Sequence, residues 1–551
     1  MSTVRIIPLG GLGEVGRNSL VLEVDGEIVL VDAGLMFPEE EMLGIDLVIP
    51  DFTYVRQRAE RFRGVLITHA HEDHIGALPY LLREHPVPVY GTKLTLGLLR
   101  TKLKEHKLHE STDFREIAVG EPFHIGRVEF EAYHVCHSIP DAVGFAARTP
   151  LGQLVHSGDW KFDHTPVDGQ QTDFAHLARI AERGVHILLS DSTRAEVPGY
   201  TRSEAYVGDL LESIFAQASG RIIITTFASN ISRIKQIVDI AAAWGRRTSI
   251  IGRSMENYSK TARDLGYLEL PENALLHPSR IGDVEEGKLC IITTGSQGEP
   301  TSALARMAVG DHKFVEVKPG DTVVLSATPI PGNEELVNRT IDNLYKLGAE
   351  VIYDAAVRPH VSGHASQEEL KLMLNILRPQ HFVPLHGEYR MLVRHARLAE
   401  DLGVAHENVH VLENGDVLEL DEHGARLGAS VSAGYVYIDG AGAGDVTQVV
   451  VRDRWALASD GIFVVVVGVS HETGRLISGP DIITKGFVPP EDEGEIVEAS
   501  KRRILEAFDG AGPETRAEVG VIKDRIHETV GPLLYERTRR RPMILPIVTQ
   551  V

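Results

Sequence analysis

Cysteine is nearly absent from this chain of 551 residues, which has 2 cysteines against 25 histidines. So few thiols exclude a disulfide framework and a zinc site built from several thiolates, and they indicate a reducing compartment. A bound metal ion would therefore be held by imidazole and carboxylate groups.

Long apolar runs and an excess of positive charge are also missing. The longest apolar run, GIFVVVVGV from Gly461, has only the length of a strand, and the first residues lack the pattern of a signal peptide. We therefore expect a cytoplasmic protein without a membrane span. The formal net charge of -22, from 56 basic and 78 acidic residues, opposes a nucleic-acid partner because polyanions repel.

Two patterns of predicted elements follow one another along the chain. Up to about residue 135, short strands rich in Val, Ile and Leu follow in quick succession, with a hairpin signal at Asp25 and Gly26. From Gly220, strands alternate with helices, which is typical of a parallel sheet covered by helices. A Gly- and Ala-rich stretch near residue 440 predicts a linker to a small terminal α/β domain.

The strongest local signal is THAHEDHIGALP, which places His69, His71, Asp73 and His74 directly after an apolar strand. Imidazoles two residues apart in a turn can converge on one cation, while Asp73 and His74 turn toward a neighbouring cation. A chance cluster on a polar loop is the alternative, and four ligand-type residues at this spacing argue against it.

Three further candidate ligands stand at later strand ends, namely His137, Asp159 and His386. A carboxylate has two ligand oxygens, so Asp159 suits a bridge between two cations. His137 alone could be an ordinary core or surface histidine, and only the combined order of residues favours a ligand role.

This order of residues resembles the metallo-β-lactamase fold, in which Asp32 matches an acidic position that orients ligands without binding metal. The resemblance implies two divalent cations with Asp159 and a hydroxide between them. One cation would be held by His69, His71 and His137, and the other by Asp73, His74 and His386. Zinc suits the histidines best, while the carboxylates leave room for Mn²⁺ or Mg²⁺.

Asp159 and His386 lie far apart in the chain, which predicts an inserted domain between them. The runs RPHVSGHAS and PLHGEYRML, together with GGLGEVGRN near the start, resemble the β-CASP nucleases and, among them, the bacterial ribonuclease J family. The implied fold is α/β: a metallo-β-lactamase αββα sandwich with an inserted Rossmann-like β-CASP domain and a small α/β C-terminal domain. We expect the sandwich over 1–205 and 361–430, the insert over 206–360, a linker over 431–450 and the last domain over 451–551.

The resemblance also implies the activity. It predicts a metal-dependent ribonuclease that degrades single-stranded RNA from a 5′ monophosphate in the 5′ to 3′ direction, cleaves internally as well, and serves RNA maturation and decay. Expected partners are RNA, a second copy of the chain joined through the C-terminal domain, a tetramer of such copies, and an RNA-degradation complex.

Catalytic roles are predicted for Asp73, His364 and Asp191. His364 lies outside the ligand set and can neutralise the phosphorane or protonate the leaving 3′ oxygen, with Asp191 orienting its imidazole. The alternatives are a loop histidine bonded to its own backbone and an aspartate that caps a helix. A stretch of small residues and a helix start are expected to hold the 5′ phosphate: Ser229, Asn230, His360, Val361, Ser362, Gly363, His364, Ala365 and Ser366.

Other interpretations stay open at this point. The run Gly11 to Gly16 is a literal GxGxxG, but strands follow it where a dinucleotide site needs a helix. A nuclease acting on DNA, a small-molecule hydrolase of the same fold and a non-catalytic RNA-binding scaffold are the alternative functions. Although the net charge opposes a nucleic-acid partner, the locally basic stretches at 91–110 and 221–260 are expected to provide positive charge near the cleft.

Overall fold

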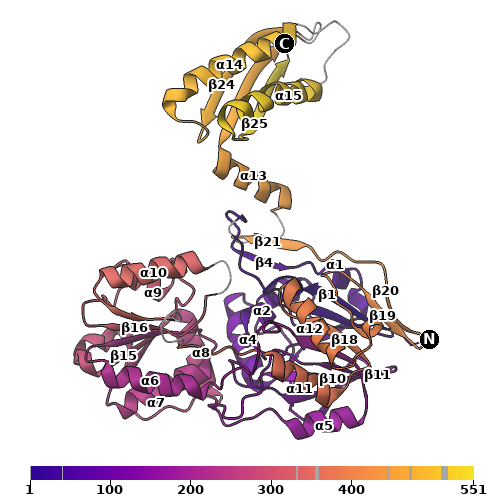
Figure 1. Cartoon of the computed structure of the whole chain (residues 1–551), viewed down its shortest axis with the longest axis vertical. Helices are drawn as coiled ribbons and strands as arrows, with labels where there is room; N and C mark the ends of the chain where they lie inside the picture. The colour runs from indigo at the N-terminus through magenta and orange to yellow at the C-terminus, as the bar shows by residue number, and fades with distance from the viewer. Residues whose placement is uncertain are drawn as a thin grey trace. The chain divides into compact units, whose positions relative to one another are not determined.

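The computed structural model describes residues 2–39, 41–329, 333–353, 359–440, 442–443, 446–470, 475–509 and 519–550. The chain forms two compact units, of which the first comprises Met1–Phe37 and Val48–Val436 and the second comprises Pro38–Leu47 and Tyr437–Val551 (Figure 1). No helix within the described ranges is long and apolar enough to cross a membrane.

The first unit contains two sheets that face one another. The larger sheet has eight strands in the order β20 (Gly424–Leu427), β19 (Leu418–Asp421), β1 (Val4–Gly10), β2 (Ser19–Val24), β3 (Glu27–Val31), β5 (Phe62–Leu66), β6 (Val89–Gly91) and β7 (Phe114–Glu116). Asp25 and Gly26 join β2 to β3 with positive φ angles of 49° and 83°, the conformation that a tight hairpin turn requires. The hairpin signal in the sequence is therefore confirmed.

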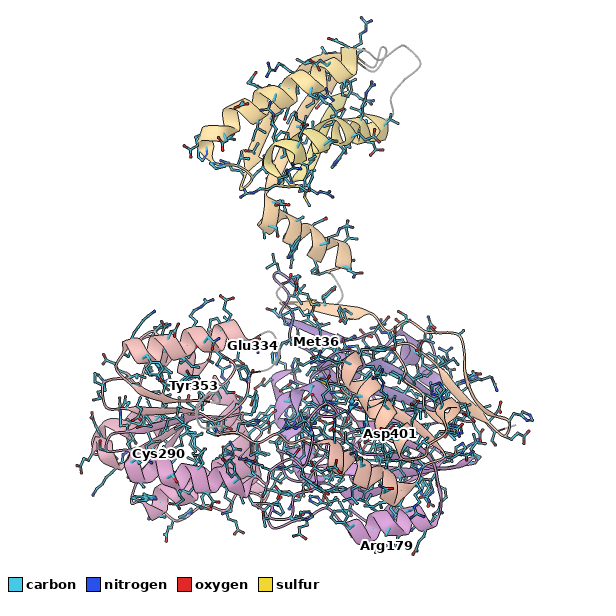
Figure 2. The ribbon with its side chains drawn as sticks, viewed as in Figure 1. Met36, Arg179, Cys290, Glu334, Tyr353 and Asp401 are labelled. Atoms are coloured by element: carbon cyan, nitrogen blue, oxygen red, sulfur yellow. The ribbon has the colours of Figure 1, made fainter. Side chains whose placement is uncertain are left out.

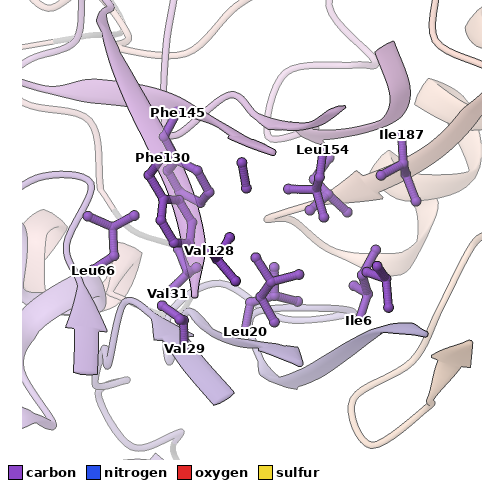
Figure 3. Close-up of a cluster of buried hydrophobic side chains, with 14 of the residues drawn as sticks. Ile6, Leu20, Val29, Val31, Leu66, Val128, Phe130, Phe145, Leu154 and Ile187 are labelled. Atoms are coloured by element: carbon purple, nitrogen blue, oxygen red, sulfur yellow. The ribbon is translucent and has the colours of Figure 1, made fainter. Parts of the chain in front are cut away.

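The second sheet has six strands in the order β18 (His381–Leu385), β12 (Val185–Asp191), β11 (Gly152–His156), β10 (Val143–Thr149), β9 (Val128–His134) and β8 (Pro122–Ile125). Strands β12 and β18 run parallel with Asp191 opposite Leu385, so residues that follow the two strands emerge side by side. A continuous apolar core fills the space between the sheets, with Phe130 and Phe145 among its largest members (Figure 3).

Helices cover the outer faces of this sandwich. The helices of this part of the unit are α1 (Thr53–Arg56), α2 (Glu72–Ile75), α3 (Leu78–Glu84), α4 (Lys93–Glu105), α5 (Phe174–Glu182), α11 (Gln367–Leu377) and α12 (Tyr389–Asp401), with short 3-10 turns at Ala59–Arg61 and His406–Asn408. Helix α4 contacts β6 and β7, whereas α12 packs on β18 and α11 packs on both α5 and α12. The arrangement is an αββα sandwich.

The insert lies between β12 and β18 in sequence and has its own parallel sheet in the order β14 (Arg247–Ile251), β15 (Leu289–Thr293), β13 (Ile222–Thr225), β16 (Thr322–Leu325) and β17 (Glu350–Ile352). Its helices are α6 (Ala205–Gln217), α7 (Ile231–Ala243), α8 (Arg253–Asp264), α9 (Ala303–Ala308) and α10 (Glu334–Lys346), with 3-10 turns at Pro278–Asp283 and Glu286–Lys288. Helices α6 and α7 lie on one face of the sheet and α9 and α10 on the other (Figure 1). Figure 2 labels Cys290, which is buried at the start of β15 in this sheet.

The second unit contains a three-stranded sheet in the order β24 (Leu476–Lys485), β23 (Ile462–Val469) and β25 (Met543–Gln550). Helices α14 (Pro490–Asp509) and α15 (Val519–Thr538) cover one face of this sheet, where Phe463 and Val465 point into the core. Helix α13 (Gln448–Asp460) precedes the sheet, and β21 (Tyr435–Asp439) pairs with β22 (Gly442–Ala443). Strand β4 (Leu47–Pro50) completes the elements of the described chain, and the predicted α/β fold class is confirmed.

Candidate metal centre

The loop that carries the histidine-rich motif begins two residues after β5 and is tied down by its backbone. His71 caps α2, and the carbonyls of Glu72, Asp73 and His74 accept hydrogen bonds from the backbone N–H groups of Leu35, Asn18 and Ala33. These bonds reach the segments that follow β3 and precede β2. Because the backbone is held on both sides, the side chains of the motif are fixed in a common direction.

The seven predicted ligands lie together and fall into two groups. Within each group, the potential ligand atoms all lie within 4.8 Å of one another. The first group contains His69, His71 and His137, and the second contains Asp73, His74, Asp159 and His386. Imidazole nitrogens and carboxylate oxygens are suitable ligands for zinc and for other divalent transition metals, so the donor set fits two divalent cations.

Asp159 stands between the two groups. Its Oδ2 atom lies 3.2 Å from Nε2 of His74 and 3.4 Å from Nε2 of His386, both in the second group. The same atom lies 3.8 Å from Nε2 of His69 and 4.0 Å from Nε2 of His137 in the first group. A single carboxylate therefore faces both candidate cation positions.

Asp32 fixes the position of the motif through contacts with Thr68 and His74. It follows β3 with a φ of 60°, a left-handed conformation that few residues other than glycine adopt, and its side chain is buried. Oδ1 accepts a hydrogen bond from the backbone N–H of Thr68 at 2.8 Å, and Oδ2 lies 2.7 Å from Nδ1 of His74. Because Nδ1–H is donated to Asp32, Nε2 is the nitrogen that His74 would offer to a metal ion, after losing its own proton.

The electrostatics of the two groups differ. Burial lowers the pKa of His69 and His137 well below the usual value, and it lowers the pKa of His71 to about 4. In the second group burial is outweighed by charge, since Asp159 and neighbouring carboxylates raise the pKa of His74 and of His386. The first group is thus neutral and ready to bind a cation, while in the second group carboxylates and imidazoles stabilise each other's charge.

His364 lies beside both groups without belonging to the seven ligands. Its ring packs 5.0 Å from the ring of His137 and 5.3 Å from the ring of His386, measured between centroids. Its Nδ1 lies 2.8 Å from Oδ2 of Asp191, whose other oxygen accepts hydrogen bonds from Thr193. The Asp191 carboxylate therefore fixes the orientation of this imidazole through Nδ1.

The loop that carries His364 also holds a ligand of the first group. The carbonyl oxygen of Gly363 lies 2.9 Å from Nδ1 of His137 and accepts its hydrogen, which leaves Nε2 of His137 unprotonated. A side chain at this position would collide, because a Cβ atom on Gly363 would stand 2.6 Å from Nδ1 of His137. Sequence reasoning did not find this contact, because only the fold brings residues 137 and 363 together.

The predicted phosphate residues lie in varied surroundings. Ser366 is fully buried as the cap of α11, and its Oγ already contacts Thr201 and Arg194. Val361 and Ala365 are buried, whereas Ser362 and His360 are partly exposed. Asn230 caps α7 with its side-chain oxygen, while its buried Nδ2 atom has no hydrogen-bond partner among the described residues.

The basic residues between 221 and 260 have mostly structural partners. Arg221 forms a buried ion pair with Asp321, and Arg233 forms one with Glu204. Arg233 also donates to the carbonyl oxygen of Pro359, at the start of the loop that carries His364. The local positive charge is therefore partly neutralised. This stretch offsets the repulsion between a negatively charged chain and a nucleic acid only in part.

The sandwich, the insert and the two donor groups define a class: a metal-dependent hydrolase of the metallo-β-lactamase superfamily with a nuclease-type insert. Family models match in the same order along the chain. They are the metallo-beta-lactamase superfamily at 12–179, the ribonuclease J beta-CASP domain at 219–344, a Zn-dependent metallo-hydrolase RNA specificity domain at 351–412 and the ribonuclease J C-terminal domain at 449–551.

Full-length relatives identify the family. Ribonuclease J2 of Bacillus subtilis is 44% identical over 100% of this chain and 99% of its own length. Ribonuclease J 1 of Streptococcus pyogenes is 41% identical over 99% of this chain and 97% of its own length, and ribonuclease J 2 of Staphylococcus aureus is 38% identical over 100% and 98%. The chain belongs to the ribonuclease J family and is a metal-dependent ribonuclease.

A solved structure shares the fold at low sequence identity. It is a protein of unknown function from Enterococcus faecalis V583, which is 16% identical with a TM-score of 0.56 and covers 76% of this chain and 100% of its own. This likeness supports the architecture alone.

Proposed function

We propose that this ribonuclease degrades single-stranded RNA in the 5′ to 3′ direction from a 5′ monophosphate, cleaves internally as well, and acts in RNA maturation and decay. The observation that carries the proposal is the meeting of two donor groups at Asp159, with the His364–Asp191 pair beside them. A scaffold protein needs neither feature, and a small-molecule hydrolase does not need the insert.

The seven ligands would hold two divalent cations, with zinc as the first candidate and Mn²⁺ or Mg²⁺ as alternatives. When bound, such cations supply an activated water and neutralise the oxygens of a phosphodiester. The remaining steps belong to the chain. Asp73 serves both as a ligand and as a catalytic carboxylate, and His364 gives a proton from Nε2 to the leaving 3′ oxygen while Asp191 stabilises the imidazolium.

The 5′ phosphate is proposed to bind along the loop from His360 to Ser366 and at the start of α7, where Ser229 and Asn230 lie. Nδ2 of Asn230, which has no partner among the described residues, the hydroxyl of Ser362 and the imidazole of His360 are its donors in this proposal. Ser366, Val361 and Ala365 shape the loop from buried positions, and Gly363 links it to the first donor group through His137. A phosphate held here would stand close to the metal centre, which favours cleavage near the 5′ end.

The C-terminal domain is proposed to join two copies of the chain, as a dimer or within a tetramer. The outer face of its sheet carries four exposed apolar side chains: Ile477, Ile483, Leu545 and Ile547. Exposed apolar surface of this kind is typical of protein contacts. We further propose a cytoplasmic location, participation in an RNA-degradation complex, and domains at 1–205 with 361–430, at 206–360 and at 451–551, with 431–450 as the linker.

One comparison tests the substrate preference. RNAs of one sequence with a 5′ monophosphate or a 5′ triphosphate, and the matching DNA, are incubated with the protein and zinc or manganese. The proposal predicts fast stepwise degradation of the monophosphate, slow internal cleavage of the triphosphate and little action on DNA. Equal rates on both RNAs would contradict the 5′-end preference, and loss of all three activities in Asp73→Ala is the control for metal dependence.

A further inference from the structure

The glycine-rich loop between β1 and β2 has no place in the chemistry described so far. Gly11 in this loop, together with Gly34 after β3, makes room for the side chain of Asn18. Gly11 has a φ of +89°, and a Cβ atom there would stand 2.3 Å from Oδ1 of Asn18. On the far side, a Cβ atom on Gly34 would stand 1.5 Å from the carbonyl oxygen of Asp73 and 2.9 Å from the backbone nitrogen of Asn18. The loop therefore packs Asn18 directly against the metal-binding motif.

Asn18 is bonded to Asp73 through both its backbone and its side chain. The residue is 8% exposed. Its backbone N–H donates to the carbonyl oxygen of Asp73 at 3.0 Å, and its own carbonyl accepts from the N–H of Gly34 at 2.9 Å. Its side-chain Nδ2 donates to Oδ2 of Asp73 at 3.1 Å and lies 3.1 Å from Nε2 of His74. Both side-chain contacts are to ligand atoms of the second donor group.

Asp73 is the ligand that most needs such support. Its side chain is 32% exposed, whereas that of Asp159 is 4% exposed. A carboxylate at the solvent edge samples several rotamers, and each rotamer other than the binding one weakens its hold on a cation. The N–H of a fixed amide selects the orientation in which Oδ2 faces the ligand nitrogens of His74 and His386, each 3.5 Å away.

We propose that Asn18 is a positioning residue for the second cation, and that the glycine-rich loop is folded to deliver it. The inference rests on the proposed two-cation site and adds a residue outside the seven ligands. Within the described residues, Asn18 has no hydrogen bond to His69, His71 or His137. Its loss should therefore weaken the second cation selectively.

The test is a metal titration without RNA. Metal-free full-length protein is titrated with zinc against a competing chelator, for the wild type, Asn18→Ala and Asn18→Leu. Leucine keeps the branched outline of asparagine without the N–H donor, so it separates a lost side-chain filling from the lost hydrogen bond. The affinity for the second cation should fall by about 10- to 100-fold in both variants, as for other residues that orient a metal ligand. The affinity for the first cation should stay at the wild-type value.

Asn414 offers a matched control. Its side chain holds the same loop from the other side, with Oδ1 accepting from the N–H of Leu12 at 3.1 Å and Nδ2 donating to the carbonyl of Leu12 at 3.0 Å. Within the described residues its side chain bonds only to Leu12 and Glu14, so Asn414→Ala should lower the melting temperature and leave both zinc affinities unchanged.

Three distinguishable outcomes would contradict the proposed role of Asn18 or the two-cation proposal on which it rests. Folded Asn18 variants with both affinities at the wild-type value would refute the role of Asn18 alone. Equal weakening of both cations in the Asn18 variants would mean a general effect of loop collapse. A wild type that binds a single cation would refute the two-cation proposal itself.

Discussion

The two donor groups of the metal centre lie side by side and are built on different principles. His69, His71 and His137 form a neutral group whose imidazoles are kept unprotonated by burial. The second group combines two carboxylates with two imidazoles of raised pKa, so its members already stabilise each other before a cation binds. A cation in the second group must displace those internal contacts, and its affinity depends more on residues that fix the ligands in place.

Asp159 belongs to the second group and also faces the first, so its replacement should have the largest effect. Asp159→Asn keeps the shape of the side chain but removes the charge that faces both cation positions. We expect RNA cleavage to fall by about 10³-fold or more, because charge stabilisation at the reacting phosphate is lost. Zinc titration should show weakening at both sites. Loss at one site alone would show that Asp159 does not bridge them.

His364 should affect the reaction and leave both cation sites intact, whereas Asp191 also faces His386, with its Oδ1 3.5 Å from Nδ1 of that residue. His364→Ala removes the proposed proton donor and should lower kcat by about 10²- to 10⁴-fold. Asp191→Asn should lower kcat less, because the imidazole remains. Unchanged zinc stoichiometry in His364→Ala is the internal control, and a variant that cleaves RNA at the wild-type rate would remove His364 from the mechanism.

Replacement of Gly363 should weaken binding of the first cation, whereas replacement of Asn18 should weaken binding of the second. In Gly363→Ala the new methyl group would press on His137, from which a Cβ atom would be only 2.6 Å away. The first cation should bind about 10- to 100-fold more weakly, since the methyl group displaces His137 from the carbonyl that orients it, while the second keeps its affinity. The same titration checks this, and a selective loss of the second cation would contradict the assignment of His137 to the first group.

Replacement of Thr193 should have a smaller effect, on the binding of the second cation. Its hydroxyl lies 2.6 Å from Nδ1 of His386 and 2.7 Å from Oδ1 of Asp191. Thr193→Val is nearly isosteric, and we expect about tenfold weaker binding of the second cation because His386 loses a partner. Thr193→Ser, which keeps the hydroxyl, should restore the wild-type affinity. Failure of serine to do so would point to packing by the methyl group.

The smallest effect is expected at the two cysteines, whose thiols should resist alkylation in the native protein. Burial raises the pKa of the Cys136 thiol, and it raises the pKa of Cys290 to about 12. Neither is expected to react with iodoacetamide in the native protein, although Cys136 directly precedes the ligand His137. Mass spectrometry of the native and unfolded protein measures this. Rapid native alkylation of Cys136 would show that the segment before His137 is open to solvent.

The clustering of the candidate ligands could be predicted because they come in short motifs at strand ends. His69, His71, Asp73 and His74 are within six residues, and the late His386 follows a readable apolar strand. The orienting contacts could not be predicted, because Gly363 and His137 meet only through the fold and Asn18 lies in a motif that resembles a dinucleotide loop. Nor does sequence reveal that Arg221 and Arg233 are engaged in buried ion pairs, since charge counts say nothing about partners.

Anomalous diffraction from crystals of the active protein grown with zinc tests the central claim most directly. The account predicts two peaks on either side of the Asp159 carboxylate, one among His69, His71 and His137 and the other among Asp73, His74 and His386. In Asn18→Leu crystals grown at limiting zinc, the second peak should weaken first. A single peak in the active wild type, or two peaks that do not share Asp159, would contradict the account.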